Sequence, residues 1–132
     1  LAELYLNYAE ALNEAEGPTA EVYNAVNKIR RRAQLLDLPA NLTKDEMRNK
    51  IRQERRVELA FENHRFWDVR RWKIAEIVDN KKVHKITVNA DGTYSYPVFQ
   101  NRVFDKAKHY LFPIPQSEID KNRNLVQNPG WN

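Results

Sequence analysis

Apolar residues recur at helical spacing over the first part of the chain, and this pattern ends near residue 80. In the first segment, the spacing i, i+3, i+4, i+7, i+11 predicts a helix with one apolar face, formed by Leu1, Leu4, Tyr5, Tyr8 and Leu12. Gly17-Pro18 ends this helix and starts the next, because Gly suits a helix C-terminus and Pro tolerates a first turn. A second helix is predicted over residues 19–36, with Val22, Ala25, Val26, Ile29, Ala33 and Leu36 facing inward.

Two further helices follow, over residues 44–62 and 65–78. Thr43 and Glu46 stand three residues apart at the start of the third helix, which is the spacing of a capping box. Asn63 is a plausible cap between the two helices, since Asn tolerates the left-handed region. Four helices in this order predict two antiparallel hairpins, an arrangement similar to tetratricopeptide packing.

The pattern changes to alternation after Asn80. Ile86 and Val88 alternate with polar neighbours, residues 89–92 form a turn signal, and Tyr94 and Tyr96 alternate again, which predicts a β-hairpin. Residues 110–115 must be extended around two prolines, and residues 115–120 are expected to form a short helical turn. The tail ends in a turn presenting Trp131, which we expect to pack on the body of the protein. The predicted fold is mainly α, with helical hairpins over residues 1–78 followed by a β-hairpin and loop-rich tail over residues 79–132.

The segment from Glu54 to Trp72, ERRVELAFENHRFWDVRRW, combines acids, arginines and large aromatic residues at high density. Projection of residues 47–62 as a helix places two acids within an apolar stripe formed with Met47, Ile51 and Phe61, the acids being Glu54 and Glu58. Buried carboxylates are costly unless they are paired and hydrogen-bonded. We therefore predict a structural ion-pair network in which these acids pair with the arginines that follow, Arg65, Arg70 and Arg71.

The same two acids could instead form a catalytic carboxylate pair of the kind found in glycoside hydrolases. Such pairs flank an open cleft, whereas Glu54 and Glu58 are centred on the predicted packing face, so the structural interpretation is preferred and no catalytic residue is assigned. If the pair is buried, Glu58→Ala should cost about 3–5 kcal/mol of stability. Trp67 and Trp72 are expected to belong to the helical core.

The composition and the spacing of particular residue types argue against several other kinds of protein. The chain has 132 residues, a net charge of +4 and no cysteine, which excludes disulfides and cysteine–zinc sites. No run of 18 apolar residues is present. The three histidines are far apart in the sequence, so no metal or other cofactor is predicted. Arg30, Arg31 and Arg32 are consecutive and would spread around a helix, which argues against a nucleic-acid surface.

Four segments together resemble the C-terminal part of the SusD/RagB family: LAELYLNYAEALNEAEG, VNKIRRRAQL, ERRVELAFENHRFWDVRRW and HYLFPIPQSEIDKNRNLVQNPGW. They span nearly the whole chain, and only residues 79–108 carry no recognisable family motif. One departure is Asn63, where the family typically has Gly. Family members are much longer and carry a lipidated cysteine near their N-terminus, so the chain is expected to be a portion of a longer protein.

The resemblance implies an outer-membrane lipoprotein at the cell surface of Bacteroidetes-type bacteria. Such a protein binds a glycan or other nutrient and passes it to a SusC-like TonB-dependent transporter; it is not an enzyme, and only its N-terminal lipid anchor contacts the membrane. The candidate glycan-binding residues here are Tyr94 and Tyr96, since a hairpin can expose both on one face, but the preferred interpretation is that they cover the helices beneath. The alternative is a tetratricopeptide-like module that binds a peptide or protein in its helical groove.

Overall fold

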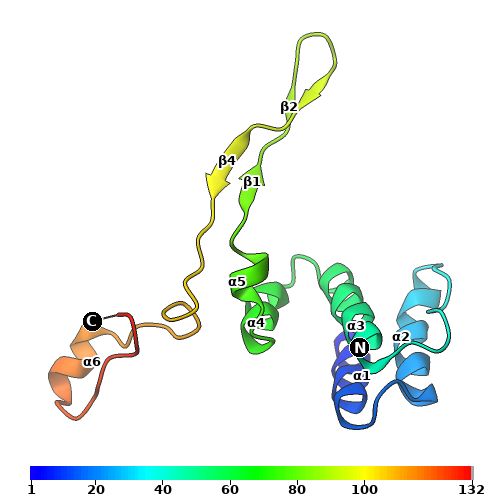
Figure 1. Cartoon of the computed structure of the whole chain (residues 1–132), viewed down its shortest axis with the longest axis horizontal. Coiled ribbons are helices and arrows are strands. Elements are labelled where there is room, and N and C mark those ends of the chain that lie inside the picture. Colours follow the sequence, from blue (N-terminus) through cyan, green and yellow to red (C-terminus); the bar gives the residue numbers. More distant parts are fainter. Residues whose placement is uncertain (132) are drawn as a thin grey trace. The chain divides into compact units, whose positions relative to one another are not determined.

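The computed structural model, in which residues 1–131 are described, consists of helices with two small pieces of sheet (Figure 1). The chain forms two compact units, residues 1–65 and 66–132, whereas the sequence analysis placed the change of character at residue 78. The first unit contains three helices, α1 (Ala2–Glu16), α2 (Ala20–Arg32) and α3 (Lys44–Glu58). The predicted fold class, helix-rich with a small sheet component, is confirmed.

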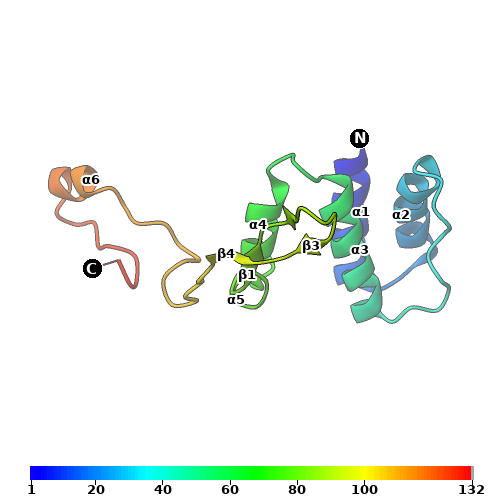
Figure 2. The same ribbon diagram turned by 90° about the horizontal axis from the view of Figure 1, so that it is seen from above.

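The core of the first unit lies where α1 packs against both α2 and α3 (Figure 2). Its fully or nearly fully buried members are Ala9, Val22, Ala25, Val26, Leu38, Met47 and Ile51. The inward face of α2 agrees with the sequence pattern as far as Ile29. The predicted face of α1 was wrong in part, because Leu6, Ala9 and Asn13 are its buried residues and Leu1 and Leu4 are exposed.

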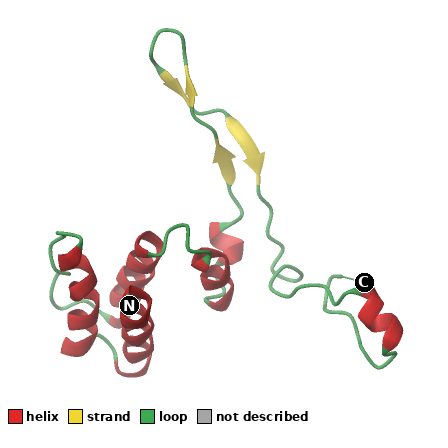
Figure 3. Cartoon of the chain, turned by 180° about the vertical axis from the view of Figure 1, so that it is seen from behind, coloured by secondary structure: helices red, strands yellow, loops and turns green. Residues whose placement is uncertain are grey.

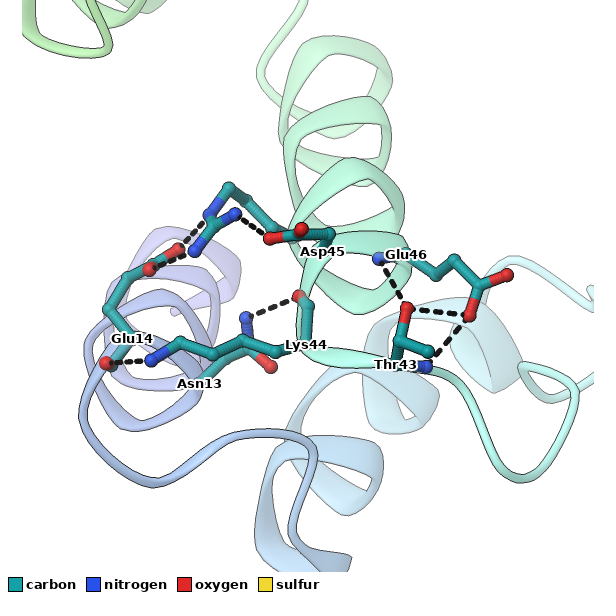
Figure 4. Close-up of polar contacts among 7 residues, drawn as sticks. Asn13, Glu14, Thr43, Lys44, Asp45 and Glu46 are labelled. Atoms are coloured by element: carbon teal, nitrogen blue, oxygen red, sulfur yellow. Dashed lines mark hydrogen bonds and ion pairs between the residues drawn. The ribbon is translucent and has the colours of Figure 1, made fainter.

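Polar side chains fasten the long connection between α2 and α3 to the helices. Asn27 accepts a hydrogen bond from the backbone N–H of Leu38 at 2.9 Å, and the hydroxyl of Tyr23 accepts one from Leu42 at 2.9 Å. The side-chain amide of Asn13 donates to the carbonyl of Lys44 at 3.1 Å (Figure 4). The first two bonds satisfy N–H groups of the connection that have no partner in a helix or sheet, and the third joins α1 to the start of α3.

The capping box at the start of α3 is confirmed. The hydroxyl of Thr43 accepts from the N–H of Glu46 at 3.3 Å, and the Glu46 carboxylate accepts from the N–H of Thr43 at 2.8 Å (Figure 4). The first of these bonds satisfies an N–H of the first helical turn, and the second satisfies the N–H of the cap residue. The N–H of Thr43 and its hydroxyl, the latter at 2.7 Å, both donate to the Glu46 carboxylate, and these two hydrogen bonds lower the pKa of its carboxyl.

Two helices end earlier than predicted. α2 stops at Arg32, with Gln34 at a φ of 58°, and Leu36 is exposed. α3 stops at Glu58, and Phe61 takes a φ of 65° and is fully exposed. Phe61 therefore does not belong to the apolar stripe of α3. Asn63 does adopt the left-handed conformation that its residue type favours, with a φ of 64°.

The second unit begins within α4 (His64–Arg71), which is separated from α5 (Ala75–Val78) by a break at Lys73, where φ is 53°. The single helix predicted over residues 65–78 is thus two helices. Val69, Ala75 and Phe104 form the buried core of this unit, with Tyr110 packed against them. The hydroxyl of Tyr110 accepts from the N–H of Ala75 at 3.1 Å and donates to the Glu76 carboxylate.

The predicted β-hairpin is present as two short ladders (Figure 3). β1 (Lys82–His84) pairs with β4 (Val98–Asn101), with an irregularity between Val83 and His84, and β2 (Thr87–Val88) pairs with β3 (Tyr94–Ser95). The turn closes at Gly92, whose φ of 81° suits a residue without a Cβ.

The tail folds back on the extended segment that precedes it. α6 (Gln116–Lys121) follows Pro115, in agreement with the predicted helical turn. The side-chain amide of Gln127 accepts from the N–H of Ile114 at 2.8 Å and donates to its carbonyl at 2.9 Å, as a neighbouring strand would. The indole N–H of Trp131 lies 3.0 Å from the carbonyl oxygen of Leu111 and 3.2 Å from that of Lys108, so Trp131 packs on the preceding part of the tail.

Candidate functional site

The two acids of α3 each pair with an arginine of α2. Arg30 Nη1 donates to Glu54 Oε2 at 2.7 Å, and Arg32 Nη2 donates to the two oxygens of Glu58 at 2.6 and 2.7 Å. The acids are largely covered, with side chains 11% and 16% exposed, respectively, whereas Arg32 is 67% exposed. Both carboxylates are therefore engaged in joining two helices, the first pair mostly shielded from water and the second open to it.

These partners differ from the arginines chosen in the sequence analysis. Arg71 Nε pairs with Asp68 at 2.9 Å, and Arg70 donates to the carbonyl of Phe66 at 3.0 Å and lies over its ring. Arg65 is half-buried. The reason for the difference is geometric. α3 ends at Glu58, and the last turn of α2 brings its own arginines, far away in sequence, alongside α3.

Arg55 is the charged residue of α3 that sequence reasoning missed. Its side chain is buried, Nη1 donates to Asn7 Oδ1 at 2.7 Å, and Nη2 lies 3.4 Å from His64 Nδ1. The signal was available in the spacing, because Met47, Ile51 and Arg55 follow one another at i, i+4 and share a helix face.

The hairpin tyrosines proposed as glycan-binding residues lie at the β2–β3 end of the hairpin. Tyr94 and Tyr96 are 61% and 62% exposed, and the Tyr96 carbonyl lies 2.7 Å from His84 Nδ1. Asp91 stabilises the adjacent turn by accepting from the hydroxyl of Thr93 at 2.7 Å and from its N–H at 3.0 Å, and these two bonds lower the pKa of the Asp91 carboxyl. Planar rings exposed beside a defined turn are suited to stacking on the apolar face of a sugar.

Trp67 lies in α4 and Trp72 directly follows it, and both were expected to be core residues. Trp72 is half-buried, with Arg71 above its ring at 4.7 Å. Trp67 is 59% exposed and packs edge-on against Phe66, with ring centroids 5.0 Å apart. The expectation was therefore wrong for Trp67, which lies on the surface of the second unit.

The described part of the chain has neither a metal-binding cluster nor a membrane-spanning helix. Within residues 1–131, no group of three or more His, Asp or Glu side chains is arranged to hold a metal ion. None of the helices described over those residues is long and apolar enough to cross a membrane.

Comparison with known proteins identifies the family. The model of the SusD family matches residues 1–131, which is nearly the full chain. The chain belongs to the SusD family. Its curated relatives include SusD-like protein P2 of Formosa agariphila, which is 36% identical over 138 aligned residues. That alignment covers 98% of the chain but 25% of the relative, so the chain spans about a quarter of the length of this SusD-like protein.

Solved SusD-like structures have the same fold. A SusD-like protein from Bacteroides fragilis is 38% identical, with a TM-score of 0.89 over 98% of this chain and 25% of that one. A SusD homologue from Bacteroides thetaiotaomicron is 34% identical, with a TM-score of 0.72 over 98% of this chain and 26% of that one. The recognition of the SusD/RagB family from four sequence segments is thus confirmed.

Proposed function

We propose that the protein binds an oligo- or polysaccharide at the outer-membrane surface and delivers it to a SusC-like TonB-dependent transporter. In this proposal the chain described here is mainly scaffold, and its parent is a lipoprotein anchored by an N-terminal lipid. The observation that carries the proposal is the family match over residues 1–131, since surface capture of nutrients is what the family resemblance implies.

The hairpin supplies the local chemistry for such binding. Tyr94 and Tyr96 present two exposed rings on one short segment, and Asn89 and Asp91 of the adjacent turn carry polar groups that can bond sugar hydroxyls. We propose these tyrosines as contacts for the glycan.

Affinity electrophoresis of the full-length protein through gels containing single polysaccharides tests the binding step. At least one polysaccharide should retard the wild type, and Tyr94→Ala combined with Tyr96→Ala should reduce the retardation. Tyr8→Ala is a matched control, because Tyr8 is a half-exposed tyrosine on α1 that bonds Glu21. If no polysaccharide retards the wild type, the protein does not bind a glycan of this panel and the proposal fails. If the double variant is retarded as strongly as the wild type, the two tyrosines are not glycan contacts.

Binding without catalysis is the second part of the proposal. Glu54 and Glu58, the pair considered for hydrolysis, are each held by an arginine of α2. Carboxylates that join two helices in this way are not free to flank a glycosidic bond, as a catalytic pair must. Incubation of the full-length protein with the polysaccharide that it binds should release no reducing ends, and the appearance of reducing ends would contradict this part.

Delivery is tested separately. The transporter encoded beside the gene should copurify with the full-length protein from detergent-solubilised outer membranes, and recovery of the protein alone would remove the transporter from the proposal.

A further inference from the structure

A hollow on the second unit combines aromatic rings with positive charge. It has a volume of about 380 Å³ and lies between the end of α4 and residues 110–112, where a turn ends. We call it the cationic hollow. Its principal lining residues are Trp67, Arg70, Arg71, Lys73, Tyr110 and Phe112. The volume is within the range of small-ligand pockets.

The aromatic wall of the cationic hollow is exposed on the second unit of this chain. Trp67 and Phe112 are each more than half exposed, and their ring centroids are 6.1 Å apart with the planes tilted by 57°. The Phe66 ring packs against both rings, and its centroid lies 5.0 Å from that of Trp67 and 6.1 Å from that of Phe112. Large exposed aromatic rings held in a rigid cluster mark binding surfaces more often than isolated exposed apolar residues do.

The polar part of the wall is cationic. Of the described residues that line the hollow, none carries a carboxylate or a carboxamide. Tyr110 has the only hydroxyl among them, and this group already donates to Glu76 and accepts from Ala75. A neutral sugar needs acceptors as well as donors for its hydroxyl groups. The lining therefore suits a ligand that brings its own negative charge.

Two of the cations are placed over rings. The ammonium of Lys73 lies 4.2 Å from the centre of the Tyr110 ring, and the guanidinium of Arg70 lies 3.5 Å from the centre of the Phe66 ring. Arg70 Nε is buried and makes no hydrogen bond within residues 1–131. Burial lowers the pKa of the Arg70 guanidinium, and the charge of Asp79 opposes that effect. An anion beside Arg70 would replace the solvation that this group has lost.

The acids close to the cationic hollow are already engaged. Asp68 pairs with Arg71 at 2.9 Å, and Glu76 accepts from Tyr110. Lys73 lies at the break between α4 and α5, where its φ of 53° turns the chain out of the helix. Arg71 is therefore paired with an acid, and Arg70 and Lys73, which lie over aromatic rings, are the cations that the hollow offers to a ligand.

We propose that the cationic hollow binds an acidic saccharide, one whose ring stacks on Trp67 and whose carboxylate or sulfate group pairs with Arg70 and Lys73. This inference rests on the proposed function and specifies the class of glycan. The aromatic wall accounts for the sugar ring, and charge complementarity accounts for the anionic substituent.

The test compares charged saccharides with neutral counterparts on the full-length protein, by isothermal titration calorimetry at low salt. Oligogalacturonate and its methyl ester differ in the carboxylate, and a sulfated galactan oligosaccharide and its desulfated form differ in the sulfate. We expect at least one charged member to bind more tightly than its neutral counterpart. Lys73→Gln should weaken that binding about tenfold and leave neutral glycans unaffected, because the lost pair involves an ionic group.

Lys85→Gln is the matched control, because Lys85 is an exposed lysine on the hairpin, outside the lining of the hollow. Equal affinity for both members of each pair, or an unchanged affinity in Lys73→Gln, would overturn the inference. If the protein binds neutral glycans but fails this test, only the inference about the cationic hollow is refuted. If the protein binds no saccharide, the proposed glycan-binding function is refuted as well.

Accessibility of Trp67 in the full-length protein gives an independent check. Acrylamide should quench the fluorescence of the wild type more than that of Trp67→Phe, and a bound acidic saccharide should remove the difference. If the two proteins are quenched equally without ligand, other parts of the protein cover the hollow and the inference is wrong.

Discussion

The guanidinium of Arg55 donates to Oδ1 of Asn7 across 2.7 Å and so joins α3 to α1 through a buried charge. Met47 and Ile51 occupy the same face of α3 and are fully covered, so the stem of Arg55 continues an apolar stripe while its end group reaches a polar partner. This single side chain therefore contributes both packing and a charge-assisted hydrogen bond.

Arg55→Ala should lower the free energy of unfolding by about 2–4 kcal/mol, since it removes a buried stem and leaves polar partners without their donor. Arg55→Met should cost less, about 1–2 kcal/mol, because it retains most of the stem. Urea denaturation measures both. Arg56→Ala is the control, an exposed neighbour expected to change stability by less than about 0.5 kcal/mol. Equal effects of Arg55→Ala and Arg56→Ala would contradict the burial of Arg55.

The two helix-joining ion pairs should differ in strength. In double-mutant cycles with alanine, the coupling of Arg30 with Glu54 should be about 1–2 kcal/mol, because both side chains are largely covered. The coupling of Arg32 with Glu58 should be at most about 1 kcal/mol, since Arg32 is exposed and water screens the pair. The sequence analysis expected Glu58→Ala to lower stability strongly if the pair was buried. Because Arg32 is exposed, we now expect a smaller loss of stability. Couplings in the opposite order would show that burial does not set these energies.

Local chemistry explains which elements could be predicted from the sequence. The capping box at Thr43 and the turn before Thr93 depend on residues within four positions of one another, and both are present. The end of α3 was missed because Phe61, whose residue type does not favour a positive φ, adopts one there. The same applies to Lys73, where the predicted fourth helix breaks.

Long-range choices were harder to predict. Leu4 and Leu6 are chemically equivalent candidates for the core, and only the positions of α2 and α3 select Leu6. Glu54 had several arginines within reach along the chain, and its partner is Arg30, 24 residues away. The candidate site divides in the same way: the exposed hairpin tyrosines follow from a local turn, whereas the cationic hollow requires α4 to meet a segment some 40 residues later in the chain.

Acid should weaken the contact between α1 and α3. Arg48 donates to both carboxylate oxygens of Glu14, at 2.5 and 2.6 Å, and also pairs with Asp45. The hydrogen bonds from Arg48 lower the pKa of Glu14 below its ordinary value of 4.5, against a smaller opposing effect of burial. A lowered folded-state pKa means that the stabilisation is complete above pH 4.5 and disappears as the pH falls through the folded-state value.

Glu14→Gln removes this contribution, which is at most about 1 kcal/mol for a pair open to water. The free energy of unfolding, measured from pH 7 to pH 2, should therefore fall less steeply below pH 4.5 in Glu14→Gln than in the wild type. Glu16→Gln serves as the control, because Glu16 is an exposed acid near the end of the same helix. Parallel pH profiles for wild type and Glu14→Gln would contradict the assignment.

Gly130 fixes the position of Trp131, and its substitution tests how the tail is attached. A Cβ at Gly130 would lie 2.9 Å from the Cβ of Lys108, and the φ of 77° is unfavourable for other residues. Gly130→Ala should therefore displace the indole from the carbonyl groups of Lys108 and Leu111 and increase hydrogen exchange at their amides. Gly92→Ala has a similar φ of 81° but nothing within 4 Å of the added Cβ, so it isolates backbone strain from the clash. If Gly130→Ala leaves exchange at those amides unchanged, the tail does not depend on this close approach.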